Sequence, residues 1–131
     1  MSMKRVAIIS LTLIFSLCLV TGAFAADKDA IKKQVDDIVV AIDGGKKAQD
    51  FMGAAQNKPY YVFIMEKGGM LLVHPSLVGK SLKEKAAPVY TECAKATAEG
   101  VWVGYVWKGN QKHTYVRLTK GGLIVGSGYS E

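Results

Sequence analysis

The chain has 131 residues, half of them hydrophobic, with 17 Lys and Arg against 11 Asp and Glu and a formal net charge of +6. This length suits a single domain with a modest hydrophobic core. The lysines are scattered along the chain rather than gathered into a stripe, which excludes a nucleic-acid-binding function.

Residues 1–25 have the pattern of a secretory signal peptide. Lys4-Arg5 precedes the apolar run Val6–Val20, and Ala23-Phe24-Ala25 places small residues at the cleavage positions. A membrane helix needs about 20 predominantly apolar residues, and this run is shorter and is interrupted by Ser and Thr. We therefore predict cleavage after this segment, export to the periplasm and no retained membrane span.

Residues 26–131 form the mature chain in this prediction. They are 106 of the 131 residues, and their net charge is +4 rather than +6 because two of the 17 Lys and Arg are lost. Cys93 is the only cysteine left, so an intramolecular disulfide is excluded. We interpret Cys93 as a small core residue of a helix rather than a reactive thiol.

The mature chain begins with a predicted helical arm. From Asp29 onward, apolar residues recur with the spacing of an amphipathic helix and charged residues lie between them. These apolar residues are Ile31, Val35, Ile38 and Ile42. Gly44-Gly45 ends this helix, and Lys46–Ala55 repeats the helical pattern. The two helices are expected to cover one face of a sheet.

Two strands and a helix are expected next. Tyr60–Met65 is too uniformly apolar to have a wet face, so it predicts a strand that is buried on both sides. Met70–His74 is expected to pair back with it after a Gly-Gly turn. Ser76–Lys85 is predicted to be a loop, and Pro88–Ala96 a helix with proline in its first turn and Gly100 at its end.

The segment Val101–Tyr129 predicts three consecutive strands. Runs of β-branched and aromatic residues are separated by the turn pairs Gly109-Asn110 and Gly121-Gly122. The predicted fold is therefore α+β, with a five-stranded antiparallel sheet, N-terminal helices and one inserted helix.

The motifs of common enzymes and cofactor sites are absent from the sequence. His74 and His113 lack the spacing of a zinc pair, and there is no nucleophile elbow, phosphate-binding loop or dinucleotide fingerprint. We therefore predict no enzyme activity, no metal and no cofactor.

Several segments, in their order and spacing, resemble the single Cache domains, extracytoplasmic sensory modules of bacterial chemoreceptors and sensor kinases. They are Gly45–Ala48, Tyr61–Leu82, Gly100–Trp107, Lys112–Val116 and Val125–Tyr129. The resemblance implies a PAS-like fold and a pocket on one sheet face for a small organic acid, often a short carboxylate. It also implies a role in signal transduction or chemotaxis.

The chain departs from the family pattern at four points. Glu66 stands where the family usually has Asp, the Asp- and Gly-rich insertion between Leu82 and Val89 is missing, and the loop Lys108–Gln111 is short. The chain ends at Glu131, after the last strand, without an output segment. We therefore expect a stand-alone periplasmic form that is read by a membrane receptor or sensor kinase.

The resemblance also implies which residues line the pocket. The four principal candidates are His74, Tyr105, Lys112 and Tyr115, and Tyr61 and Trp107 support them. The alternatives are a structural strand-end role for the histidine, core roles for the aromatic residues and a solvated hairpin position for Lys112. Tyr115 is expected to share a face with Arg117.

Other functions remain open at this point. The shortened loops could close the pocket and leave a protein-interaction module that binds no small ligand. The apolar stripe of the first helix could form a homodimer, although a stripe this short is more often the face packed on the sheet.

Overall fold

A computed structural model of the protein describes residues 25–131, so the predicted signal peptide, apart from Ala25, lies outside the described residues. The helices are α2 (Lys28–Asp43), the 3-10 helix η1 (Ala48–Gln56), α3 (Leu82–Lys85) and α4 (Ala87–Cys93). The strands are β1 (Val62–Met65), β2 (Leu71–Val73), β3 (Val101–Trp107), β4 (Asn110–Leu118) and β5 (Ile124–Ser130).

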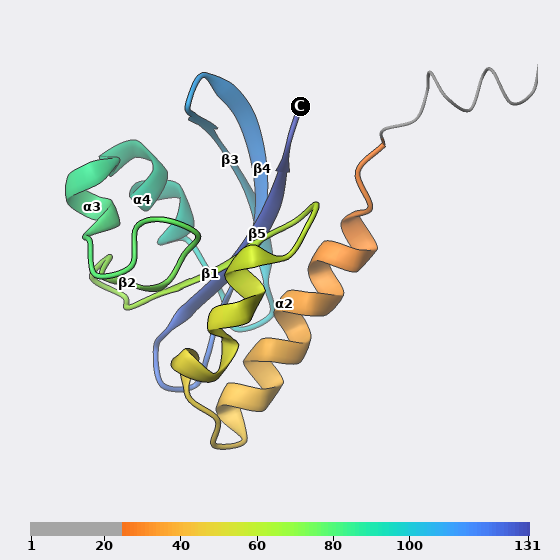
Figure 1. The fold of residues 1–131 in the computed structure, drawn as a ribbon, viewed down its shortest axis with the longest axis vertical. Helices are drawn as coiled ribbons and strands as arrows, with labels where there is room; N and C mark the ends of the chain where they lie inside the picture. Colours follow the sequence, from red (N-terminus) through yellow and green to blue (C-terminus); the bar gives the residue numbers. More distant parts are fainter. Residues whose placement is uncertain (1–24) are drawn as a thin grey trace, which may run out of the picture.

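The five strands form one antiparallel sheet in the order β2-β1-β5-β4-β3. Figure 1 shows α2 on one side of this sheet and the pair α3 and α4 on the other. The predicted α+β class and five-stranded antiparallel sheet are therefore confirmed, although the insertion between β2 and β3 holds two short helices rather than one.

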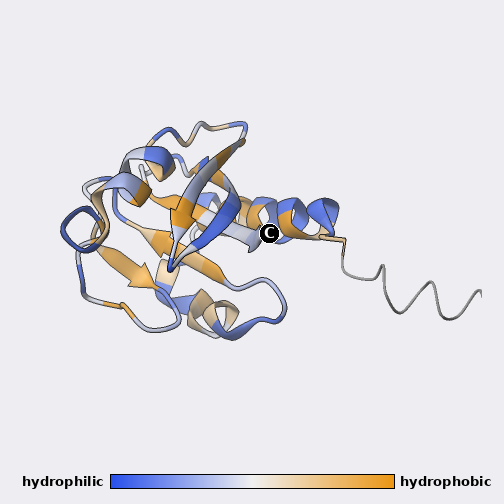
Figure 2. Cartoon of the chain, turned by 90° about the horizontal axis from the view of Figure 1, so that it is seen from above, coloured by the Kyte–Doolittle hydropathy of each residue, from blue (hydrophilic) through white to orange (hydrophobic). Residues whose placement is uncertain are grey.

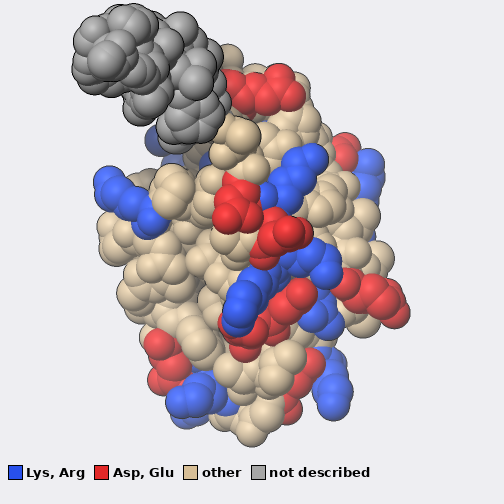
Figure 3. Space-filling view, turned by 90° about the vertical axis from the view of Figure 1, so that its right-hand side faces the viewer, with Lys and Arg blue, Asp and Glu red and all other residues tan. Residues whose placement is uncertain are grey.

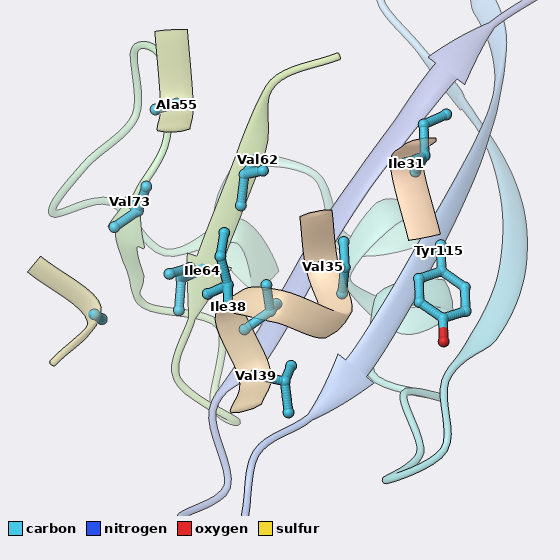
Figure 4. Packing of buried hydrophobic residues seen from close by; sticks show 11 residues of the cluster. Ile31, Val35, Ile38, Val39, Ala55, Val62, Ile64, Val73 and Tyr115 are labelled. Atoms are coloured by element: carbon cyan, nitrogen blue, oxygen red, sulfur yellow. The ribbon is translucent and has the colours of Figure 1, made fainter. Parts of the chain in front are cut away.

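Helix α2 covers the first face of the sheet through its predicted apolar stripe. The Asp27 side chain caps the helix by accepting a hydrogen bond from the backbone N–H of Ala30. Ile31 and Val35 are fully buried, and they pack with Val62 of β1 (Figure 4) and belong to the same cluster as Val125 of β5. In Figure 2 the apolar colour follows this inner side of the helix and the strands. Because the stripe packs on the sheet, it is not an exposed surface for a dimer.

The opposite face of the sheet is covered by α3 and α4. Leu82, Val89 and Cys93 from these helices pack against Phe63 of β1 and Val116 of β4. Cys93 is completely buried, which confirms its interpretation as a core residue of a helix. Both faces of β1, and of β5 from Ile124 to Gly128, are therefore buried, as the uniformly apolar sequence of β1 predicts.

Three local predictions need correction. The segment Ser76–Lys85 is not entirely a loop, because Ser81 accepts a hydrogen bond from the N–H of Glu84 and starts helix α3. The second N-terminal helix is a 3-10 helix with non-helical angles at Phe51. The turn between β3 and β4 consists of Lys108 and Gly109, one residue earlier than predicted. Both residues have positive φ, as a tight two-residue hairpin requires.

The outer surface of α2 carries mixed charge. Lys32 and Lys33 pair with Asp36 and Asp37 one turn later, and Arg117 of β4 also pairs with Asp36. Figure 3 shows blue and red residues interleaved over this side of the molecule. Such a surface has no basic stripe to follow a nucleic-acid backbone.

Gly100 offers a test of the packing between β3 and β4. It has a φ of 100°, and a Cβ there would overlap the Tyr115 hydroxyl group. Gly45 has a φ of 119° with no atom within 4 Å of its Cβ position, so it is a matched control for backbone strain alone. We expect Gly45→Ala to cost about 1–3 kcal/mol of unfolding free energy in urea titrations, and Gly100→Ala clearly more. Equal losses would contradict the close contact.

Candidate functional site

Five of the six predicted site residues lie on the sheet face that α3 and α4 cover. Tyr105 of β3 and Lys112 of β4 are directly paired across the two strands and therefore point to the same side. The Tyr61 and His74 rings lie edge to face with centroids 5.7 Å apart, and both line one cavity with Tyr105 and Trp107. The predicted grouping of these five side chains is thus present in the structure.

Tyr115 lies on the other face, under α2. Its hydroxyl group donates to Asp36 Oδ1 (3.1 Å) or to the Glu99 carbonyl (3.0 Å), and Arg117 Nη1 also donates to Asp36. Burial, followed by Asp36, raises the pKa of Tyr115 to about 12. Lys112 and Tyr115 are three residues apart on one strand, and the two-residue alternation of a strand sends them to opposite sides. The structure therefore does not bring Tyr115 to the other candidates.

His74 is held in one neutral form by the turn that follows β2. The backbone N–H groups of Ser76 and Leu77 both donate to its Nδ1 atom, each at 3.0 Å. An Nδ1 that accepts hydrogen bonds leaves the ring proton on Nε2. Burial, followed by the nearby charges of Lys108 and Lys112, lowers the pKa of His74 to about 4. His74 is therefore an uncharged hydrogen-bond donor at neutral pH.

Lys112 is buried, with only 8% of its surface exposed. Its ammonium group lies 3.2 Å from the Tyr61 hydroxyl oxygen and 4.4 Å from the centre of the Tyr61 ring. Within residues 25–131 it forms no ion pair with a carboxylate. Burial lowers the pKa of Lys112, and Lys108 lowers it further. The alternative of a solvated hairpin lysine is therefore wrong.

The remaining polar groups on this face are uncharged. The Tyr105 hydroxyl shares a hydrogen bond of 2.8 Å with the Thr114 hydroxyl. Burial raises the pKa of Tyr105 and of Tyr61, and it raises the pKa of the Cys93 thiol to about 12. At neutral pH this face therefore presents hydroxyl and imidazole donors and the ammonium group of Lys112, without a thiolate nucleophile.

Three hollows border this cluster, and two of them reach His74 or Lys112. The cavity between His74, Tyr105 and Trp107 measures about 20 Å³, which is room for about one water molecule. A cleft of about 560 Å³ opens beside it at the end of β5, and Lys112 and Tyr61 line its wall. Tyr61 borders both of these hollows.

Two residues that sequence analysis missed anchor Tyr61 to helix α2. Gln34 of α2 donates from Nε2 to the Ser127 hydroxyl (2.8 Å) and to the Tyr60 carbonyl (3.0 Å), and the Ser127 hydroxyl donates to the Tyr61 carbonyl (2.7 Å). Ser127 is 1% exposed, so this chain of bonds runs through the core. No local pattern joins these residues, because 93 positions separate Gln34 from Ser127.

Solved structures of known proteins share the fold of this chain. A methyl-accepting chemotaxis protein from Vibrio parahaemolyticus superimposes with a TM-score of 0.55 at 16% identity, over 79% of this chain and 87% of that one. The fold is Cache-like. At this identity the similarity establishes the fold alone.

Two further structures match less well. The ligand-binding domain of the Pseudomonas fluorescens chemoreceptor CtaA in complex with L-leucine has a TM-score of 0.43 at 21% identity, over 63% of this chain and 37% of that chain. A Cache chemosensory domain described for carboxylic acid recognition has a TM-score of 0.38 at 20% identity, over 98% of this chain and 90% of that one. No family model and no curated protein matches the chain.

The described residues carry neither a metal-binding cluster nor a helix suited to a membrane. Residues 25–131 contain no group of three His, Cys, Asp or Glu side chains that could hold a metal ion. Among the same residues, no helix combines the length and apolar character that crossing a bilayer requires.

The low pKa of His74 predicts a loss of stability in mild acid. The folded value of about 4 lies below the ordinary 6.5, so the unfolded chain binds the proton first as the pH falls. The neutral ring contributes stability that is complete above pH 6.5 and is lost towards pH 4, up to about 3 kcal/mol. We expect His74→Gln to flatten the curve of unfolding free energy against pH in urea titrations. Parallel curves for both proteins would contradict the assigned neutral form.

Because Lys112 is buried without a carboxylate partner in residues 25–131, we expect its removal to stabilise the ligand-free Cache-like domain. Lys112→Met keeps the length of the side chain and removes the desolvated charge, so we expect the unfolding free energy to rise by about 1 kcal/mol. Lys108→Met changes an exposed lysine of the neighbouring turn and should stay within about 0.5 kcal/mol. A clear loss of stability in Lys112→Met would show instead that the ammonium group is structural.

Proposed function

We propose that this protein is a non-enzymatic sensory domain that binds a small organic carboxylate in the periplasm and is read by a membrane receptor or sensor kinase. The observation that carries the proposal is the ammonium group of Lys112, which is buried beside Tyr61 without a carboxylate partner in residues 25–131, while the Tyr61 ring contacts His74. A buried charge is costly unless it is paired, and a bound carboxylate would supply the missing partner.

The neighbouring groups suit the same ligand. The Tyr61 oxygen accepts a hydrogen bond from Lys112, so its own proton remains for a ligand oxygen. The Nε2–H group of His74 is a second neutral donor, because Nδ1 is occupied by backbone N–H groups. A carboxylate here would receive charge-assisted hydrogen bonds, which are shorter and stronger than neutral ones.

The fold and the sequence support the sensory role. The Cache-like fold is shared with a methyl-accepting chemotaxis protein, and the pattern of residues 1–25 predicts export to the periplasm. The raised pKa values of Cys93, Tyr61 and Tyr105 keep these groups protonated, which suits binding rather than nucleophilic catalysis.

A second candidate function is a protein-interaction module without a small ligand. The observation that favours it is the cavity of about 20 Å³ at His74 and Trp107, which is far smaller than the 300–1,000 Å³ of ordinary small-molecule sites. The shortened loops noted in the sequence lie at its border. In that case the sheet or α2 would dock directly on a partner.

A thermal-shift screen of organic acids separates these functions. The panel extends from acetate, propionate and succinate to benzoate and phenylacetate, each at 1 mM with the mature chain. An acid present at 100 times its Kd stabilises the folded protein by about 2.7 kcal/mol, which gives a readily measured rise in melting temperature.

Two variants control the screen. Lys112→Met should abolish the shift given by any active acid, because the cation for the carboxylate is lost, whereas Lys108→Met should keep it. A panel in which no acid stabilises the wild-type protein would overturn carboxylate binding and favour the interaction module. A shift that survives in Lys112→Met would remove Lys112 from the site.

A further inference from the structure

The large cleft lies where the sheet is open on one side. Strand β1 pairs with β5 only up to Val62 opposite Ser127, while β4 continues along β5 as far as Ser130. Beyond Ser127, β5 therefore has a strand neighbour on one side only within residues 25–131. The segment Pro59–Tyr61 diverges from β5 at this point, and the cleft of about 560 Å³ fills the gap.

The walls of this cleft combine flat apolar surfaces with the ammonium group of Lys112 and, in the predicted mature chain, the α-amino group of Ala26. Tyr60, Tyr61 and Tyr129 also line the cleft; Lys112 shares the sheet face of Tyr61, whereas Tyr129, opposite His113 on β4, lies on the α2 side. Its volume falls within the 300–1,000 Å³ range of small-molecule sites, whereas the cavity at Trp107 is more than tenfold smaller. The cleft beside Lys112 thus has room for the body of a ligand, and the cavity at Trp107 does not.

The position of Lys112 connects the cleft with the proposed carboxylate site. Its side chain is 92% buried and lines the cleft, and its ammonium group has three donors of which Tyr61 accepts one. A carboxylate that pairs with this ammonium group can therefore direct the rest of the molecule into the cleft.

We propose that the cleft binds the body of the ligand and that the ligand is an aryl monocarboxylate, with its carboxylate on Lys112 and its ring among the tyrosines. This inference rests on the proposed carboxylate binding and adds the class of acid. A flat ring gains offset or edge-to-face contacts with tyrosine rings that an aliphatic chain does not.

The far side of the cleft restricts the ligand to one carboxylate. Glu131 lines the cleft, and its side chain pairs with the His113 ring, which stacks on Tyr129. A second carboxylate on the ligand would meet this negative charge. Lys112 and Glu131 thus mark a positive and a negative end of the same cleft.

Isothermal titration of the mature chain with phenylacetate, acetate and 4-carboxyphenylacetate tests the inference. Phenylacetate should bind about ten- to hundredfold more tightly than acetate, because a buried ring adds this much affinity. 4-Carboxyphenylacetate, which carries a second carboxylate at the opposite end of the ring, should bind more weakly than phenylacetate. Tyr129→Leu removes a ring from the cleft and should weaken phenylacetate about three- to tenfold without affecting acetate.

Tyr90→Leu is the matched control, because Tyr90 of α4 lines neither the small cavity nor the cleft, and it should leave phenylacetate binding unchanged. Trp107→Leu changes the wall of the small cavity and shows whether the ring enters there instead. Amide chemical shifts give a readout that does not depend on variant stability: phenylacetate should shift Gly128 and Ser130 more than Val103 of β3.

The alternative outcomes are distinct. If acetate binds as tightly as phenylacetate, and Trp107→Leu rather than Tyr129→Leu weakens binding, the proposal that the cleft binds the ligand ring is overturned. The proposal that the domain binds a carboxylate then still holds. If ring compounds bind equally well to Lys112→Met, the carboxylate contact is overturned. If no carboxylate binds to the wild-type protein, both proposals fail together.

Discussion

The alternation of side chains along β4 is the constraint on which the structure depends, because this strand is packed on both faces. Lys112, Thr114 and Val116 point toward α3 and α4, whereas Tyr115 and Arg117 point toward α2. One strand therefore supplies the cation of the candidate site and, on its reverse side, the groups that hold helix α2. A shift of one residue in its register would exchange the two sets.

Lys112, a buried lysine without a carboxylate partner in residues 25–131, lowers the stability of the folded domain, and the surrounding apolar packing offsets this cost. The dry clusters on both sides of the sheet provide most of the stability, and Tyr61 offers the ammonium group only a hydroxyl oxygen and the face of a ring. Such a charge is expensive in an apolar interior. The same cost makes the site responsive to an anion, because pairing the charge recovers part of the desolvation energy.

The candidate site is also linked to helix α2 by hydrogen bonds. Gln34 of α2 is bonded to Ser127, Ser127 to the Tyr61 carbonyl, and the Tyr61 hydroxyl to Lys112. This chain of contacts passes through the sheet from one helical layer to the other face. It links the candidate site to α2 through the backbone carbonyl and the side chain of Tyr61.

The sequence by itself determined the type and order of the main elements and the buried side of α2, because these follow from local periodicity and turn residues. It also placed Tyr105 and Trp107 on one face of β3. It wrongly grouped Tyr115 with Lys112, although strand alternation already separates them.

Only the tertiary structure decided which side chains meet. The contact between Tyr61 and Lys112 joins positions 51 residues apart, and the neutral form of His74 depends on the path of the backbone after Pro75. The cleft arises because β5 extends beyond its pairing with β1. These features depend on strand register and chain path over long separations, which local patterns do not specify.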